Sequence, residues 1–151
     1  MRGYDIIVFF HVLAAIVWVG GGVMLQILLS RASRLGPESV ASFSQAAEWT
    51  SQHVFMPASF AALGFGIWAV IAGPWTFGEG WIIAGLVGFA ISSINGSAIL
   101  GPTSKKLKAA VEERGPNDPA VKQLARRIDI AGRIDLLVLV VVVFNMVVKP
   151  G

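Results

Sequence analysis

The chain has 151 residues, of which 55% are hydrophobic and 14% charged, and its mean hydropathy is +0.71. Soluble domains carry about 25% charged residues, so this composition excludes an ordinary soluble domain and predicts one integral membrane domain over residues 1–151. The chain has no cysteine, which excludes a disulfide framework, a thiolate metal site and thiol chemistry. The formal net charge of +3 does not indicate nucleic-acid binding, because the positions of the charges fit a membrane protein better.

The first apolar stretch, Ile6–Ser30, is long enough to cross a hydrocarbon core about 30 Å thick. It exceeds the core of a signal peptide, which has about 7–15 apolar residues, so we expect a retained helix. Together with three later stretches it predicts an all-α fold, a bundle of four transmembrane helices. The predicted spans cover approximately residues 6–30, 50–72, 81–101 and 130–148.

The second helix is expected to begin at Pro37, because proline suits the first position of a helix. Its first part, Ser39–Ser51, is polar enough to lie outside the lipid, and Trp49 marks an interface. Pro57 predicts a kink or local break early in the second span. Gly73-Pro74 is expected to end this long helix.

The third span is expected over Trp81–Leu100, with Gly101-Pro102 ending its helix. The fourth apolar stretch, Ile134–Val148, is short for a crossing. We therefore expect its helix to begin earlier, within Ala120–Arg133, with Asp118-Pro119 as its cap and first turn.

The basic residues predict the orientation in the membrane. Positive loops stay in the cytoplasm, so the first and third loops are expected inside, both termini outside, and helices two and four extended into the cytoplasm. This predicts a multi-pass protein of the cell membrane whose basic loops contact anionic lipid head groups of the bilayer. The basic residues of these two loops are Arg31, Arg34, Lys105, Lys106, Lys108, Arg114, Lys122, Arg126, Arg127 and Arg133.

Polar side chains inside a membrane are costly and usually functional. An inner polar group is expected near the cytoplasmic surface, and His11 lies in the outer half. From helix rise and core thickness, His11 and His53 differ in height by roughly 14 Å, too far for one metal ion. Asp135 is expected to pair with Arg133 or to be solvated, and a proton-relay role is the alternative. The members of the inner group are Gln26, Asn95 and Asp135, with His53 and Ser97 at a similar depth.

The neighbourhood of His11 on a regular helix would include Ala15, Trp18 and Gly22, at i+4, i+7 and i+11 on the same face. Small residues beside a histidine leave room for a flat ring system bound through the imidazole. The alternative is a histidine that hydrogen-bonds across a helix interface, with the small residues present for close packing. For His53, the simplest interpretation is a bond to the carbonyl freed by Pro57, or a position in interfacial water.

A stripe of small residues in the third span, Gly88, Ser92 and Gly96, predicts close helix packing, either inside the bundle or between protomers. A homodimer would bury such a face, and we expect one. The sequence contains no catalytic motif, so it leaves open whether the protein is an enzyme.

The pattern His11, six residues, Trp18, one residue, Gly20 resembles the opening helix of the CopD-like superfamily of small four-helix membrane proteins. That superfamily includes copper-resistance CopD domains, HemJ-type protoporphyrinogen oxidases and uncharacterised families, and an uncharacterised family is the nearest likeness. In the HemJ-type proteins the histidine at this position is a haem b ligand, which the resemblance carries over to His11. Those proteins also use a lysine in the third helix, and residues 81–100 contain none, so their oxidase chemistry is not implied.

The resemblance therefore favours a haem b protein used for electron transfer or another redox role, with an unspecified redox partner. His11 would be an axial iron ligand within an apolar wall that includes Phe9 and Phe10, and Met146 or His53 would supply the second. A small transporter or channel with an inner polar pathway is one alternative. A non-catalytic accessory bundle is the other.

Overall fold

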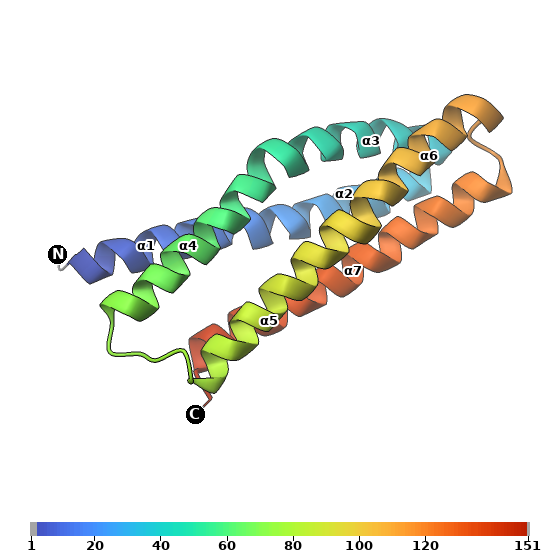
Figure 1. Cartoon of the computed structure of the whole chain (residues 1–151). Coiled ribbons are helices and arrows are strands. Elements are labelled where there is room, and N and C mark those ends of the chain that lie inside the picture. Colours follow the sequence, from blue (N-terminus) through green and yellow to red (C-terminus); the bar gives the residue numbers. More distant parts are fainter. Residues whose placement is uncertain (1–2, 151) are drawn as a thin grey trace.

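The computed structural model describes residues 3–150, apart from the side chain of Pro37, and contains only helices and their connections over that range (Figure 1). The chain runs up and down four times as four long helices, three of which contain one wider π-helical turn. Their segments are α1 (Gly3–Ala15), η1 (Ile16–Gly20), α2 (Gly21–Leu35), α3 (Pro37–Thr50), η2 (Ser51–Phe55), α4 (Met56–Ala72), α5 (Gly80–Ile94), η3 (Asn95–Leu100), α6 (Gly101–Arg114) and α7 (Pro119–Val148).

All four long helices, within the described residues, are long and apolar enough to cross a membrane. This confirms the predicted all-α, four-helix architecture. The early start expected for the fourth helix is also confirmed, since α7 begins at Pro119. Asp118 caps it by accepting a hydrogen bond from the Ala120 backbone N–H at 2.7 Å.

The third helix does not end at Gly101-Pro102 as predicted. It continues as α6 to Arg114, because proline is tolerated at the start of a helical segment once the preceding turn has widened. The widened turn is η3, which directly precedes Gly101-Pro102. The turn η2 directly precedes Met56-Pro57 in the same way, so the break predicted at Pro57 takes the form of a π-helical turn.

The connection between α2 and α3 is a single residue, Gly36, with φ of +121°. Residues with a side chain rarely adopt this backbone conformation, whereas glycine adopts it without steric conflict. The turn folds α2 and α3 into an antiparallel hairpin, and Ala32 and Val40 pack in one cluster on either side of it. Residues of α2 and α3 that are equally far from Gly36 along the chain therefore lie at about the same height along the bundle.

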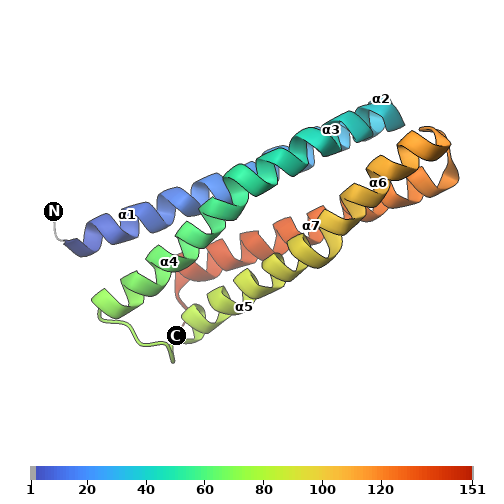
Figure 2. The same cartoon turned by 45° about the horizontal axis from the view of Figure 1, so that its top comes forward.

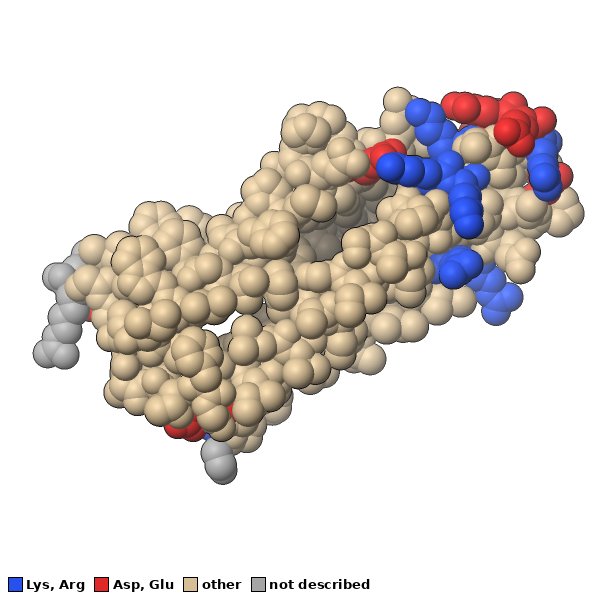
Figure 3. Space-filling view, in the orientation of Figure 1, with Lys and Arg blue, Asp and Glu red and all other residues tan. Residues whose placement is uncertain are grey.

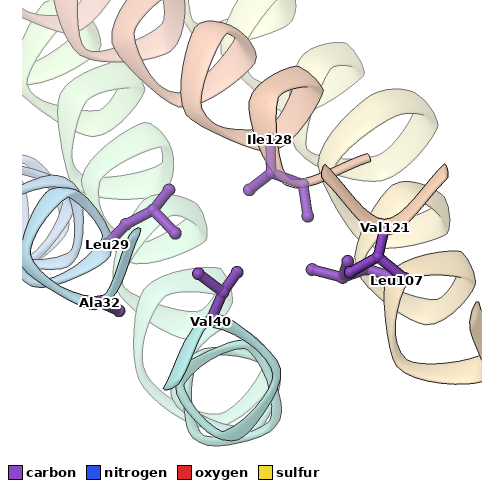
Figure 4. Close-up of a cluster of buried hydrophobic side chains, with 6 residues drawn as sticks. All are labelled: Leu29, Ala32, Val40, Leu107, Val121 and Ile128. Atoms are coloured by element: carbon purple, nitrogen blue, oxygen red, sulfur yellow. The ribbon is translucent and has the colours of Figure 1, made fainter. Parts of the chain in front are cut away.

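Most charged side chains gather at one end of the molecule, called here the basic end (Figure 3). The two termini lie at the opposite end, called here the terminal end (Figure 1). At the basic end α2, α3, α6 and α7 share a hydrophobic cluster (Figure 4). A second cluster at the terminal end joins α4 to α5 through Val70, Trp81 and Ile82.

Between these ends the bundle separates into two helix pairs, α1 with α4 and α5 with α7 (Figure 2). Aromatic rings connect the pairs near mid-length, where Trp18 meets Phe89 edge-on with ring centroids 5.5 Å apart. Towards the terminal end, narrow openings pass through the molecule between the pairs (Figure 3). The pairs are therefore joined at two levels, with unfilled space between them.

Candidate functional site

His11 lies half-buried on α1, against α4. Its Nδ1 is 2.7 Å from the backbone carbonyl oxygen of Ala62. The imidazole also lies against Gly66, where an added Cβ would be 3.0 Å from the ring atoms Cε1 and Nδ1. Glycine at this position therefore gives the ring its room, which explains why the chain has no side chain there.

The hydrogen bond to Ala62 fixes the tautomer of His11. A carbonyl oxygen can only accept, so Nδ1 carries the proton, and Nε2 of the neutral ring keeps its lone pair. Within the described residues no hydrogen bond to Nε2 is present. Histidines that bind a metal through one nitrogen commonly donate the other N–H to a carbonyl or carboxylate. In this tautomer Nε2 is the ring nitrogen that could bind a metal.

The face predicted for His11 is not formed as expected. The π-helical turn η1 adds a residue to the turn between Ala15 and Gly21, which rotates everything after it relative to His11. Trp18 accordingly contacts Phe89 on α5, away from the α4 surface that His11 touches. Gly22 has no side-chain neighbour within 4 Å of a built Cβ, so it is not a close-packing contact.

The apolar wall expected around His11 also differs. Phe9 and Phe10 are both exposed on the surface of the bundle. Phe10 stacks on Phe65 of α4, with ring centroids 5.3 Å apart, on the outer side of the α1–α4 contact. These rings hold α1 to α4 and do not enclose the imidazole.

Met146 lies on α7 and packs on the terminal-end cluster of Val70, Trp81 and Ile82. Its methyl end occupies the space that a side chain at Gly85 would need. Val70 of this cluster is one helical turn, about 6 Å, from Gly66, which touches His11, so Met146 lies nearer the terminal end than His11 by roughly a turn. It belongs to the opposite helix pair.

His53 does not share a site with His11. It is exposed, its Nδ1 is 2.9 Å from the Trp49 carbonyl oxygen, and its ring stacks on Trp49 at 4.6 Å. Its carbonyl partner is therefore Trp49, one turn earlier in the chain. Ala62, which contacts His11, lies nine residues after His53 on the same long helix, a distance of about 14 Å. One metal ion bound by both histidines would span only two metal–nitrogen bonds of about 2 Å each.

Two members of the predicted inner polar group, Gln26 and Asn95, bond to α7, which carries the third, Asp135. The side-chain amide of Gln26 donates to Asp129 Oδ1 at 2.8 Å. Asn95, which is buried, donates to the Ala131 carbonyl at 3.0 Å and to Asp135 Oδ1 at 3.3 Å. Residues of α2 and η3 are thus bonded to neighbouring turns of α7.

Asp129 is the member of this group that the sequence interpretation missed, although its i, i+4 spacing from Arg133 was a readable signal. Arg133 pairs with Asp129 at 3.0 Å. The pairing expected between Arg133 and Asp135 is therefore wrong, because residues two apart on a helix do not face each other. Ser97 bonds only its own helix, through the Ser93 carbonyl at 2.8 Å.

The small-residue stripe of the third span is used inside the chain. Gly88 and Ser92 are buried, and a side chain at Gly88 would collide with Val142 of α7. Gly96 has no side-chain neighbour within 4 Å of a built Cβ. The stripe thus serves the α5–α7 contact, and the surface from which a homodimer was predicted is not free to form one.

Asn145, the other polar residue of the outer half, joins α7 to α5 by donating to the Trp81 carbonyl at 2.7 Å. Over residues 3–150, no group of three or more His, Cys, Asp or Glu side chains is close enough to hold a metal ion. His11 remains the candidate for a single axial ligand to a metal carried by a cofactor.

A family model described as "Predicted integral membrane protein (DUF2269)" matches residues 5–150. The chain belongs to this family. Comparison with curated proteins and with solved structures gives no match. The family and the four long apolar helices together make this a multi-pass integral membrane protein.

Proposed function

We propose that the protein binds haem b through Nε2 of His11 and acts in electron transfer within the membrane. The observation that carries the proposal is the 2.7 Å hydrogen bond from His11 Nδ1–H to the Ala62 carbonyl. It holds the ring in the tautomer and orientation of a metal ligand. The likeness of the first helix to the opening helix of the CopD-like superfamily supports the same role for this histidine.

The space between the two helix pairs supports the proposal as well. It is bounded near mid-length by Trp18 and Phe89, and at the terminal end by Val70 and Trp81. These side chains are apolar or aromatic, which suits a porphyrin, and Figure 3 shows narrow openings towards the terminal end. The protein would tune the iron through the axial ligand and the low polarity around it.

Met146 is the proposed second axial ligand. It lies on the opposite helix pair, roughly a turn nearer the terminal end than His11, and a thioether is a known partner of histidine on haem iron. Its methyl end would have to leave Gly85 to turn towards the space between the pairs. His53 fits a second axial position less well, because it lies about 14 Å away along α4.

Absorption spectroscopy of the detergent-purified protein, produced with ample haem, tests the proposal. We expect a Soret band in the wild type, its loss in His11→Ala, and its retention in His53→Ala as the matched control. Met146→Leu should keep haem but change the spectrum of the iron. A colourless wild type, or full haem in His11→Ala, would overturn the proposal.

A second candidate function is transport of protons or small cations, favoured by the convergence of Gln26, Asn95 and Asp135 on α7. A carboxylate inside a membrane bundle is by default a candidate for such a role. A colourless protein whose proton flux in liposomes is abolished by Asp135→Asn would favour this function. Flux unchanged by Asp135→Asn would reject it.

We further propose that the protein lies in the cell membrane with its basic end in the cytoplasm and both termini outside. The support is the concentration of Lys and Arg at one end, in the last part of α2, in α6 and in the first part of α7 (Figure 3). Positively charged loops are retained on the cytoplasmic side.

A further inference from the structure

Four helices meet in one layer at the basic end. Their buried side chains come from α2, α3, α6 and α7, and Figure 4 shows them facing one another: Leu29, Ala32, Val40, Leu107, Val121 and Ile128. Basic residues flank the members of this layer on α6 and α7, namely Lys106, Lys108, Lys122 and Arg127. The layer therefore lies at the height of water or lipid head groups, because so many cations do not enter the hydrocarbon.

The outer face of α2, beside this layer, carries large apolar side chains that are exposed. Ile27, Leu28 and Leu35 flank the buried residues of α2, and each is exposed, Ile27 to 59% and Leu35 to 71%. Ile27 and Leu28 lie at the end of the predicted span of residues 6–30, whereas Leu35 lies beyond it and would face water or head groups rather than lipid tails. An exposed apolar side chain at that height, beside a groove, indicates an interaction surface.

A groove runs beside this face, between α2 and α3, with a volume of about 490 Å³. It contains a cation and an anion, Arg31 and Glu38. The ion pair found over residues 3–150 is that of Arg133 with Asp129, so neither Arg31 nor Glu38 has an ionic partner in the described chain. Apolar side chains and hydroxyls complete the lining: Leu28, Leu35, Phe43, Ser39 and Ser42.

We propose that this groove is the homodimer interface, and that a second copy of the chain covers it. About a twofold axis near the groove, each copy presents the same surface to the other. Arg31 would then face the partner's Glu38, and Glu38 the partner's Arg31. Leu28 and Leu35 would lie against their counterparts and leave water.

The charges favour a second copy over an anionic lipid or a partner of one charge sign. An anionic lipid would bind Arg31 but would be repelled by Glu38 in the same groove. A partner of one charge sign would meet the same conflict. A groove that holds one charge of each sign is complementary to itself. This proposal is independent of haem binding, and it uses a different surface from the glycine stripe of α5.

Disulfide cross-linking in native membranes tests the interface, because the natural chain has no cysteine. A single Leu35→Cys or Leu28→Cys variant should give a covalent dimer under mild oxidation, since a disulfide requires Cα atoms within about 7 Å of each other. Ile130→Cys is the matched control, because Ile130 is also exposed at the basic end but lies on α7. It should stay monomeric.

Charge exchange tests the pairing. In the Leu35→Cys background, Arg31→Glu should weaken dimer formation by about tenfold or more, because it places like charges opposite each other. Adding Glu38→Arg should restore the dimer. The proposal is overturned if neither cysteine cross-links above the Ile130→Cys level, if the covalent product contains a different protein, or if the double charge exchange fails to restore the dimer.

Discussion

At the scale of single residues, polar side chains in this protein act as ties between helices. Asn95 is buried and donates to the backbone of α7 at Ala131 as well as to Asp135. Gln26 and Asn145 tie α2 and α5 to α7 in the same manner. Each bond satisfies a polar group that would otherwise be unpaired in an apolar surrounding, which is costly.

Asn95→Ala should therefore destabilise the bundle by about 0.6–2 kcal/mol, the range of interhelical hydrogen bonds in membrane proteins. Thermal unfolding of the purified protein in detergent measures the effect. Ser97→Ala is the control, because Ser97 bonds only carbonyls of its own helix. Equal stability of Asn95→Ala and Ser97→Ala would contradict the structural role of Asn95.

At the scale of helices, the contact between α5 and α7 depends on small residues. Gly88 faces Val142, whose branched side chain fills the place where a Cβ would be. Branched side chains have few rotamers available in a helix, so Val142 cannot easily move away. The contact needs glycine at this point.

Gly88→Ala should thus destabilise the protein by about 1–3 kcal/mol through overpacking, measured by thermal unfolding. Gly96→Ala should be neutral or stabilising, because nothing lies near that position. Adding Val142→Ala to Gly88→Ala should recover part of the loss. A Gly88→Ala variant as stable as Gly96→Ala would show that the stripe does not pack as described.

The helices themselves were largely predictable from the sequence. Apolar runs located all four, and Asp118-Pro119 correctly marked the start of α7. Gly101-Pro102 gave a wrong end for the third helix, because the widened turn η3 allows the helix to continue past proline. A widened turn is set by the combined packing of several helices, so local sequence patterns do not reveal it.

The same limit applies to the candidate site. His11 was identified, but the face assigned to it assumed a regular helix, and η1 moves Trp18 towards α5. Its actual partners, Ala62 and Gly66, lie on another helix and could be found only once the pairing of α1 with α4 was known. The bond of Asp129 to Gln26 was hidden for the same reason, since the two residues are distant in sequence, whereas its pairing with Arg133 was readable from their spacing.

At the scale of the whole molecule, the separation of the basic end from the terminal end predicts how the protein is oriented in the membrane. A single cysteine in place of Glu79, in the α4–α5 connection, should react with a membrane-impermeant thiol reagent in intact cells. One in place of Glu113, near the end of α6, should react only after the cells are opened. The cysteine-free wild type provides the blank. Labelling of the Glu113→Cys variant in intact cells would reverse the proposed orientation.

The separation of the bundle into two helix pairs would provide the space for the proposed haem. One pair carries His11 with its fixed tautomer, and the other carries Met146. The α2–α3 groove lies at the other end of the molecule, so association of two copies would leave this space open.

Binding of haem iron by the imidazole of His11 is tested most directly by the absorption spectrum of His11→Gly with and without added imidazole. We expect no Soret band in the variant alone and its return when free imidazole takes the place of the missing side chain. A His11→Gly protein that holds as much haem as the wild type before imidazole is added would contradict it.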